Sequence, residues 1–177
     1  MPAIYESRDA EEDAIRTFWS WFAAHSEALL AIATSDDELL SSLLAQLHAI
    51  HPGLYFEIQV EREPLELVVT AEGRRELFPL VERIVLAAPA LPAWRYVALK
   101  PAQGFDFTSE FEGVRVEPTQ LWFLPLANAN TPGKLGIRVG WPELQPEQHD
   151  LALTALLKAL DTAIGERCLA TEIHHVQ

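Results

Sequence analysis

The sequence predicts an α+β fold. Three observations indicate this class. Apolar side chains recur at steps of three and four residues over residues 9–50, which is typical of amphipathic helices. Beyond residue 53 the period changes to two, which is typical of half-buried strands. The order strand, strand, helix, strand then occurs twice, at residues 54–100 and 121–176.

We expect these elements to assemble as an N-terminal helical hairpin followed by two ββαβ-like halves. The halves are expected to form a mostly antiparallel sheet with the helices packed on one face, because each apolar helical face must be buried against another layer. With 177 residues, the chain has the length of a single domain. The prediction is therefore one domain over residues 1–177, with the hairpin at 1–53 and a sheet-and-helix body at 54–177.

Two helices form the predicted hairpin. The first is expected over residues 9–33, where apolar side chains lie on one helical face. The second is expected over residues 35–50, because Ser35 and Glu38 have the spacing of a capping box and an apolar stripe follows. The sequence His51-Pro52-Gly53 then ends the helical pattern.

The first ββαβ half is expected between residues 54 and 100. Alternating apolar side chains predict antiparallel strands at 54–60 and 65–69. Helical spacing returns over 75–88, where Pro79 marks a kink or a new first turn because proline has no amide proton to donate. A strand is expected at 94–99.

The second half repeats this order. Strands are expected at 121–126 and 135–139, joined by a loop rich in Asn, Pro and Gly at 128–133. A helix is expected from Pro146 to Gly165, since proline favours a first turn and glycine favours a C-terminal end. The last strand is expected at residues 169–176.

The N-terminal residues, the apolar runs and the cysteine content suggest where the protein acts. Residues 1–13 have neither the basic nor the apolar region of a signal peptide, and the longest apolar run, residues 28–33, is too short to span a bilayer. We therefore expect a cytoplasmic protein that does not enter a membrane. A single cysteine, Cys168, excludes a disulfide within the chain, and we expect it to be a small buried side chain.

Negative charge is concentrated in the first 72 residues. They carry 14 acidic and 3 basic side chains, out of a net charge of −13 for the whole chain. Such a surface repels phosphate groups, which argues against nucleic acid and anionic lipid as ligands. The acidic side chains either keep the protein soluble or attract a protein partner with a basic surface.

Trp19 and Trp21 suggest an interface. They lie two residues apart in the first predicted helix and therefore point to different sides of it. If one tryptophan belongs to the core, the other is partly exposed or is covered by another element.

His48 and His51 are candidate ligand-binding residues. A separation of three residues on a helix brings the two imidazoles within reach of one ion. The spacing of the other residues, however, does not identify a third metal ligand. We therefore predict no metal site and no cofactor. The chain also lacks the glycine-rich phosphate loops and the nucleophile elbow, so we predict no catalytic residue.

The segment between residues 100 and 117 has an unusual composition. Phe105 is followed by Asp106, and two further carboxylates, Glu110 and Glu112, lie beside another aromatic residue. Aromatic and acidic side chains together could line a cleft for a cationic or sugar-like ligand. The alternative is a hairpin with its phenylalanines facing inward and its acidic side chains outward.

Several stretches combine aromatic residues with proline, histidine or glycine: Phe18-Trp19-Ser20-Trp21-Phe22, Ile50-His51-Pro52 with Phe56-Glu57, Phe78-Pro79-Leu80-Val81-Glu82, Ala88-Pro89-Ala90-Leu91-Pro92-Ala93-Trp94, and Gly104-Phe105-Asp106-Phe107. Together they resemble a family of uncharacterised bacterial cytosolic proteins. The resemblance implies a bacterial origin and a single domain, and it carries no catalytic residue.

Three hypotheses about function follow. The first is a non-catalytic interaction or ligand-binding domain, of which a narrower form is an acidic inhibitor or immunity-type protein for a basic partner. The second is an enzyme in which Asp106, Glu110 and Glu112, together with His51, supply acid and base. The third is a homodimer formed at an uncovered edge of the sheet.

Overall fold

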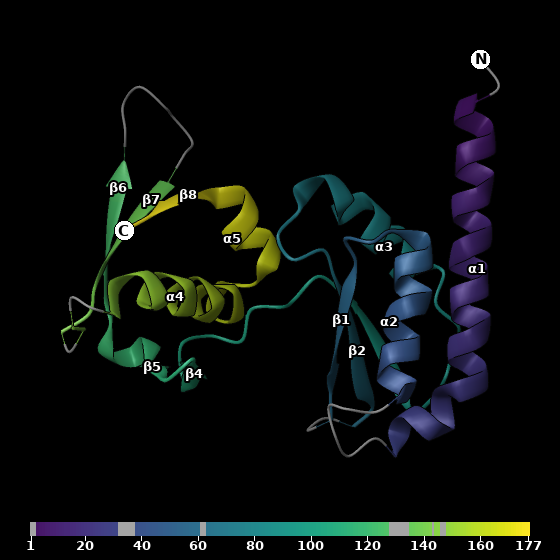
Figure 1. Cartoon of the computed structure of the whole chain (residues 1–177), viewed down its shortest axis with the longest axis horizontal. Coiled ribbons are helices and arrows are strands. Elements are labelled where there is room, and N and C mark those ends of the chain that lie inside the picture. The colour runs from purple at the N-terminus through teal and green to yellow at the C-terminus, as the bar shows by residue number, and fades with distance from the viewer. Residues whose placement is uncertain (1–2, 32–37, 61–62, 128–134, 143, 146–147) are drawn as a thin grey trace. The chain divides into compact units, whose positions relative to one another are not determined.

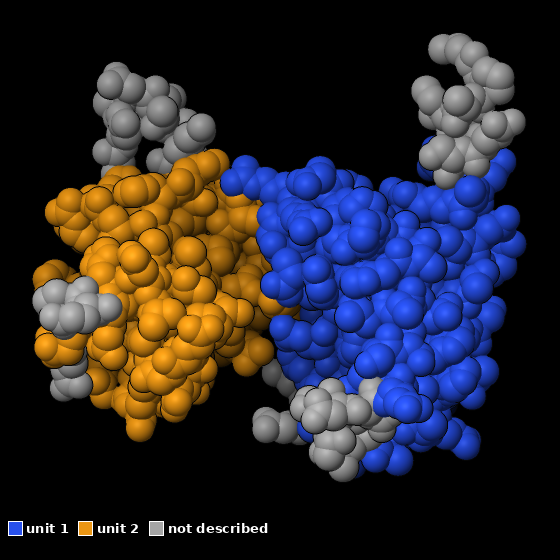
Figure 2. Space-filling model, viewed as in Figure 1, with its two compact units in different colours: residues 1–99 blue, residues 100–177 orange. Residues whose placement is uncertain are grey.

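Contacts along the chain divide it into two units, residues 1–99 and residues 100–177 (Figure 2). The sequence predicted one domain with its internal division after residue 53. The helical hairpin instead belongs to the same unit as the first ββαβ half. The computed structural model describes residues 3–31, 38–60, 63–127, 135–142, 144–145 and 148–177.

The first unit contains the predicted hairpin and the first ββαβ half (Figure 1). Its three strands form a sheet in the order β1-β2-β3, with β1 antiparallel to β2 and β2 parallel to β3. The elements are α1 (Ala3–Leu30), α2 (Glu38–Ile50), β1 (Tyr55–Gln59), β2 (Leu65–Thr70), a 3-10 turn (Arg75–Leu77), α3 (Phe78–Leu86) and β3 (Trp94–Ala98).

Most element boundaries in this unit follow the sequence signals. Pro79 lies in the first turn of α3, directly after the 3-10 turn, which confirms the expected new first turn. Helix α1 starts at Ala3, several residues before the predicted start at Asp9. The capping box at Ser35 lies outside the described residues.

An aromatic cluster forms the core between α1 and the sheet. Phe22 is fully buried, and its ring centroid lies 5.0 Å from that of Trp94 and 5.8 Å from that of Tyr96. Trp19 meets Tyr96 edge to face at 4.7 Å. Trp94 and Tyr96 alternate on one face of β3, so α1 packs on that face of the sheet.

The second unit contains the second ββαβ half, preceded by a short hairpin of β4 and β5. The order β6-β7-β8 repeats the arrangement of the first unit, with β6 antiparallel to β7 and β7 parallel to β8. The elements are β4 (Ser109–Phe111), β5 (Val114–Val116), a 3-10 turn (Pro118–Gln120), β6 (Trp122–Ala127), β7 (Leu135–Gly140), α4 (His149–Ile164), α5 (Glu166–Glu172) and β8 (Ile173–Val176).

The α+β class is confirmed, and two details of the prediction are corrected. The described strands form three separate sheets instead of one, because each ββαβ half closes its own sheet by a parallel crossover. The strand predicted over residues 169–176 is a strand only from Ile173, since residues 166–172 form α5. The predicted helix end at Gly165 is confirmed, whereas Pro146 lies outside the described residues.

The core of the second unit lies between α4 and the strands. Alanines at positions 152, 155, 159 and 163 let the backbone of α4 approach closely, and all are buried. The buried cluster combines α4 with the β4–β5 region and one face of the β6–β7–β8 sheet, and it contains Val114, Val116, Leu121, Leu156 and Leu160 with Phe123 and Val139 packed against them.

Candidate functional site

A groove of about 640 Å³ lies between α1 and the C-terminal end of α3. Residues spaced by three and four along α1 form one wall, and the end of α3 with the loop after it forms the other. The lining residues are Glu12, Ile15, Arg16, Trp19, Ser20, Ala23, Arg83, Leu86, Ala87 and Pro89.

Two contacts set the width of the groove. The indole Nε1 of Trp19 donates a hydrogen bond to the carbonyl oxygen of Ile84 at 2.7 Å, which ties the middle of α1 to α3. Arg83 forms a partly buried ion pair with Glu11 nearer the N-terminus of α1. Because both contacts are made by side chains anchored on helices, the two walls are held at a fixed spacing.

Short side chains keep the groove open. Ser20 and Ala23 on α1 face Ala87 beyond the end of α3, so little side-chain volume fills the space between the walls. Leu86 is 87% exposed at the rim of this space, although it is a large apolar residue. An exposed leucine next to an open apolar groove is typical of a surface that receives another molecule.

Acidic side chains outnumber basic ones on α1 beside the groove, whereas the ionisable residues that line the groove itself are Glu12, Arg16 and Arg83. From Arg8 onward, α1 carries five acidic and two basic side chains. Both basic residues already have acidic partners, since Arg8 lies 3.8 Å from Glu12 and Arg16 lies 2.9 Å from Asp13. Glu11 pairs with Arg83 of α3, so with Arg83 counted the acidic side chains outnumber the basic ones by five to three.

The structure separates the two predicted interface tryptophans. Trp19 is only 5% exposed and forms the floor of the groove. Trp21 is half-buried and stacks on His25, with ring centroids 4.3 Å apart. The expected arrangement of one core and one partly exposed tryptophan is confirmed.

His48 and His51 have local partners within the first unit. His51 Nδ1 accepts a hydrogen bond from the backbone N–H of Gly53 at 3.0 Å, which stabilises the turn after α2. His48 packs edge to face on Tyr55 at 5.5 Å. Among the described residues, no group of three or more His, Cys, Asp or Glu side chains is placed to hold a metal ion.

As in the hairpin alternative, residues 109–116 form a strand pair and the acidic side chains face outward, but Phe105 is exposed and does not face inward. Asp106, Glu110 and Glu112 are all exposed to solvent, and Glu110 lies opposite Arg115 in the β4–β5 pair. Phe105 is 39% exposed and lies 5.6 Å from Phe123. The three carboxylates are thus solvated in the second unit, whereas His51 belongs to the first.

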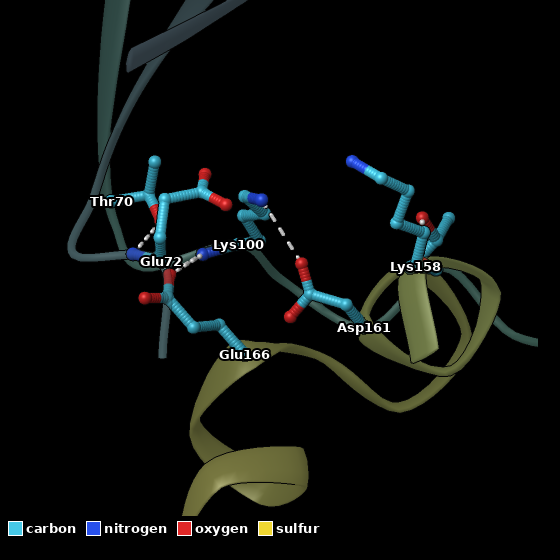
Figure 3. Close-up of polar contacts among 7 residues, drawn as sticks. Thr70, Glu72, Lys100, Lys158, Asp161 and Glu166 are labelled. Atoms are coloured by element: carbon cyan, nitrogen blue, oxygen red, sulfur yellow. Dashed lines mark hydrogen bonds and ion pairs between the residues drawn. The ribbon is translucent and has the colours of Figure 1, made fainter. Parts of the chain in front are cut away.

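A polar cluster around Lys100 fixes the start of the second unit (Figure 3). Lys100 Nζ lies 3.0 Å from Asp161 Oδ2, and its backbone N–H donates to Glu166 Oε2 at 3.1 Å. The amides of Gln103 and Gly104 donate to the carbonyl oxygens of Thr162 and Ala163. These bonds satisfy the C-terminal end of α4, so the cluster has a structural role.

Cys168 is exposed, so the prediction of a buried side chain is wrong. The prediction relied on the general tendency of free cysteine to be buried, whereas Cys168 lies on an exposed position of α5. Among the described residues, no helix combines the length and apolarity required to cross a bilayer.

Sequence reasoning identified Trp19 but missed Leu86 and the alanines of the groove. One signal was present in the sequence, because Leu86 lies off the apolar stripe of α3 formed by Leu80, Val81 and Ile84. An apolar side chain outside the stripe of an amphipathic helix is expected to be exposed or to contact a partner.

Comparison of the chain with protein-family models, curated proteins and solved structures found no match. The resemblance to a bacterial family and the origin that it implies therefore stay predictions.

Proposed function

We propose that the protein is a non-catalytic binding domain whose α1–α3 groove receives an amphipathic basic segment of a partner protein. The observation that carries this proposal is the exposed Leu86 at the rim of an apolar groove beside an acidic helix. Apolar side chains of the partner would enter between Ala23 and Ala87, and its basic side chains would meet the carboxylates of α1. An inhibitor or immunity-type protein for a basic partner is a special case of this function.

A helix is the shape that the groove favours. Its walls are themselves helical and its lining residues follow one face of α1 over Glu12 to Ala23. An amphipathic helix laid into such a groove inserts side chains spaced by three and four residues.

Fluorescence anisotropy with a synthetic amphipathic helical peptide of leucine and lysine tests the proposal. We expect the peptide to bind the full chain, and the same peptide with glutamate in place of lysine to bind much more weakly. Leu86→Ala is expected to weaken binding about fivefold or more, since a central apolar contact is lost. Ala23→Phe, which fills the groove from the exposed side of α1, is expected to block binding.

Val60→Ala is the matched control, because Val60 is another large apolar residue of the first unit and is 60% exposed. It should leave the affinity unchanged. Equal binding of the two peptides, or an affinity that Leu86→Ala and Ala23→Phe do not change, would contradict the proposed function.

A further inference from the structure

One face of the β6–β7–β8 sheet is apolar and open. Side chains of β6 alternate, so that Phe123 packs against the core while Trp122 and Leu124 point to the opposite face. There Trp122 is 65% exposed and Leu124 is 49% exposed. These two side chains form an apolar surface that the second unit does not use for its own core.

Glycine holds the tryptophan ring flat on this face. Trp122 lies directly opposite Gly140 in the β6–β7 pair. A Cβ atom at Gly140 would lie 2.3 to 2.7 Å from three atoms of the indole ring, so the ring covers the glycine backbone. One face of the indole is therefore packed on β7, and a rigid aromatic surface of this kind binds a partner at low entropic cost.

A cation lies beside this aromatic surface. Arg138 is the partner of Leu124 across the β6–β7 pair and is exposed on the same face, between Gly136 and Gly140. With the side-chain amide of Gln177 turned so that its oxygen faces Arg138, the guanidinium donates two hydrogen bonds to it at 2.7 and 2.8 Å. This neutral partner orients the guanidinium and adds no negative charge beside it.

The charge of this sheet contrasts with that of the chain. No Asp or Glu occurs in β6, β7 or β8, although the whole chain has a net charge of −13. The ionisable side chains of these strands are Arg138, His174 and His175, and His175 lies opposite Gly136 on the face of Arg138. Charge complementarity therefore favours an acidic occupant, because an arginine fork pairs well with carboxylates.

We propose that this face of the β6–β7–β8 sheet binds an acidic segment of a partner protein that also carries apolar side chains. The apolar side chains pack on Trp122 and Leu124, and a carboxylate pairs with Arg138. The site lies in the second unit and shares no residue with the α1–α3 groove, so it is independent of the function proposed above.

The test is fluorescence anisotropy of the full chain with a labelled synthetic peptide in which leucine and glutamate alternate. We expect this peptide to bind, with an affinity that falls as salt is added. A peptide with lysine in place of glutamate is expected not to bind at this face. Trp122→Ala and Arg138→Gln should each weaken binding of the glutamate peptide about fivefold or more.

Two surface substitutions of the same unit serve as controls. Leu157→Ala removes an exposed leucine from α4, and Arg115→Gln removes an exposed arginine from β5. Both should bind the glutamate peptide like the unaltered chain. Leu124→Glu adds a negative charge at an exposed position of the face, so it should abolish binding even if Trp122→Ala fails to fold.

The inference is overturned if the lysine peptide binds this face as well as the glutamate peptide, or if Leu124→Glu and Arg138→Gln bind the glutamate peptide normally. Light scattering at the same protein concentrations gives a further outcome. A dimer of the unaltered chain that Leu124→Glu dissociates would show that a second copy, and not an acidic segment, occupies the face.

Discussion

Lys100 and Glu166 are joined by two reciprocal hydrogen bonds. The backbone N–H of Glu166 donates to the carbonyl oxygen of Lys100 at 3.0 Å, and the backbone N–H of Lys100 donates to Glu166 Oε2 at 3.1 Å. Glu166 is fully buried. The Glu166 carboxylate thus accepts the hydrogen bond of the Lys100 backbone amide. It connects the first residues of the second unit to the start of α5.

Replacement of Glu166 tests this connection. We expect Glu166→Ala to destabilise the second unit by about 1–3 kcal/mol, because the partly buried amide of Lys100 loses its acceptor. Hydrogen exchange of the Lys100 amide, followed by NMR, should become faster. Glu172→Ala removes an exposed glutamate from the same helix and should change neither quantity. An unchanged exchange rate at Lys100 in Glu166→Ala would contradict the assigned role.

Gly165 should be less tolerant of a side chain than Gly113. Both residues have a φ of 82°, a backbone conformation that L-residues rarely adopt. A Cβ at Gly165 would also lie 2.9 Å from the backbone nitrogen of Ala102, whereas a Cβ at Gly113 would meet nothing within 4 Å. Chemical denaturation should show Gly165→Ala to be the more destabilising substitution by about 1–3 kcal/mol. Equal losses of stability would show that residue 102 moves away without cost.

The hydroxyl of Tyr96 should make stability depend on pH in the alkaline range. Burial raises the pKa of Tyr96 from 10.0 to about 12. Between these values the unfolded chain releases the phenol proton before the folded chain does, so stability should fall as the pH rises from about 10 to 12 and be fully retained below 10. Absorbance titration of the phenolates should show one tyrosine ionising near the upper value.

Tyr96→Phe is the matched variant for this titration. Among the described residues the buried hydroxyl of Tyr96 has no hydrogen-bond partner, so its removal should not destabilise the protein at neutral pH. The late ionisation step should also disappear. A large loss of stability in Tyr96→Phe at neutral pH would reveal a partner for the hydroxyl.

Phe22 should be more sensitive to replacement than Trp21 on the same helix. It is fully buried between the rings of Trp94 and Tyr96, so Phe22→Ala should destabilise the first unit by about 3–5 kcal/mol. Trp21→Ala removes a half-buried ring that stacks on His25 and should cost less. Thermal unfolding followed by circular dichroism compares the two. A larger loss in Trp21→Ala would mean that the core of the first unit lies elsewhere.

The ββαβ order of both halves could be predicted because it depends on local patterns. Alternation marks β1 and β2, and Pro79 and Gly165 mark the start of α3 and the end of α4. Helix α5 was missed because Leu169, Thr171 and Ile173 alternate like a strand. The contacts that favour the helix, such as the bond from Glu166 to Lys100, join residues far apart in the chain.

The candidate sites were predictable only in part. A tryptophan pair on one helix suggests that Trp19 and Trp21 differ in burial, since positions two residues apart point to different sides of a helix. The groove itself depends on the distance between α1 and α3, which the Trp19–Ile84 hydrogen bond sets. The exposure of Trp122 likewise depends on which face of its strand the core occupies.

The sequence by itself determined the class, the two ββαβ repeats and the concentration of negative charge in the first 72 residues, because periodicity and charge are properties of the chain. Only the tertiary structure decided that the repeats form separate sheets, that α5 precedes the last strand, and that Leu86 and Trp122 are left exposed. Each of these features depends on which residues far apart in the sequence pack together. The hydrophobic effect that drives this packing is non-directional, so the local sequence pattern does not specify the contacts.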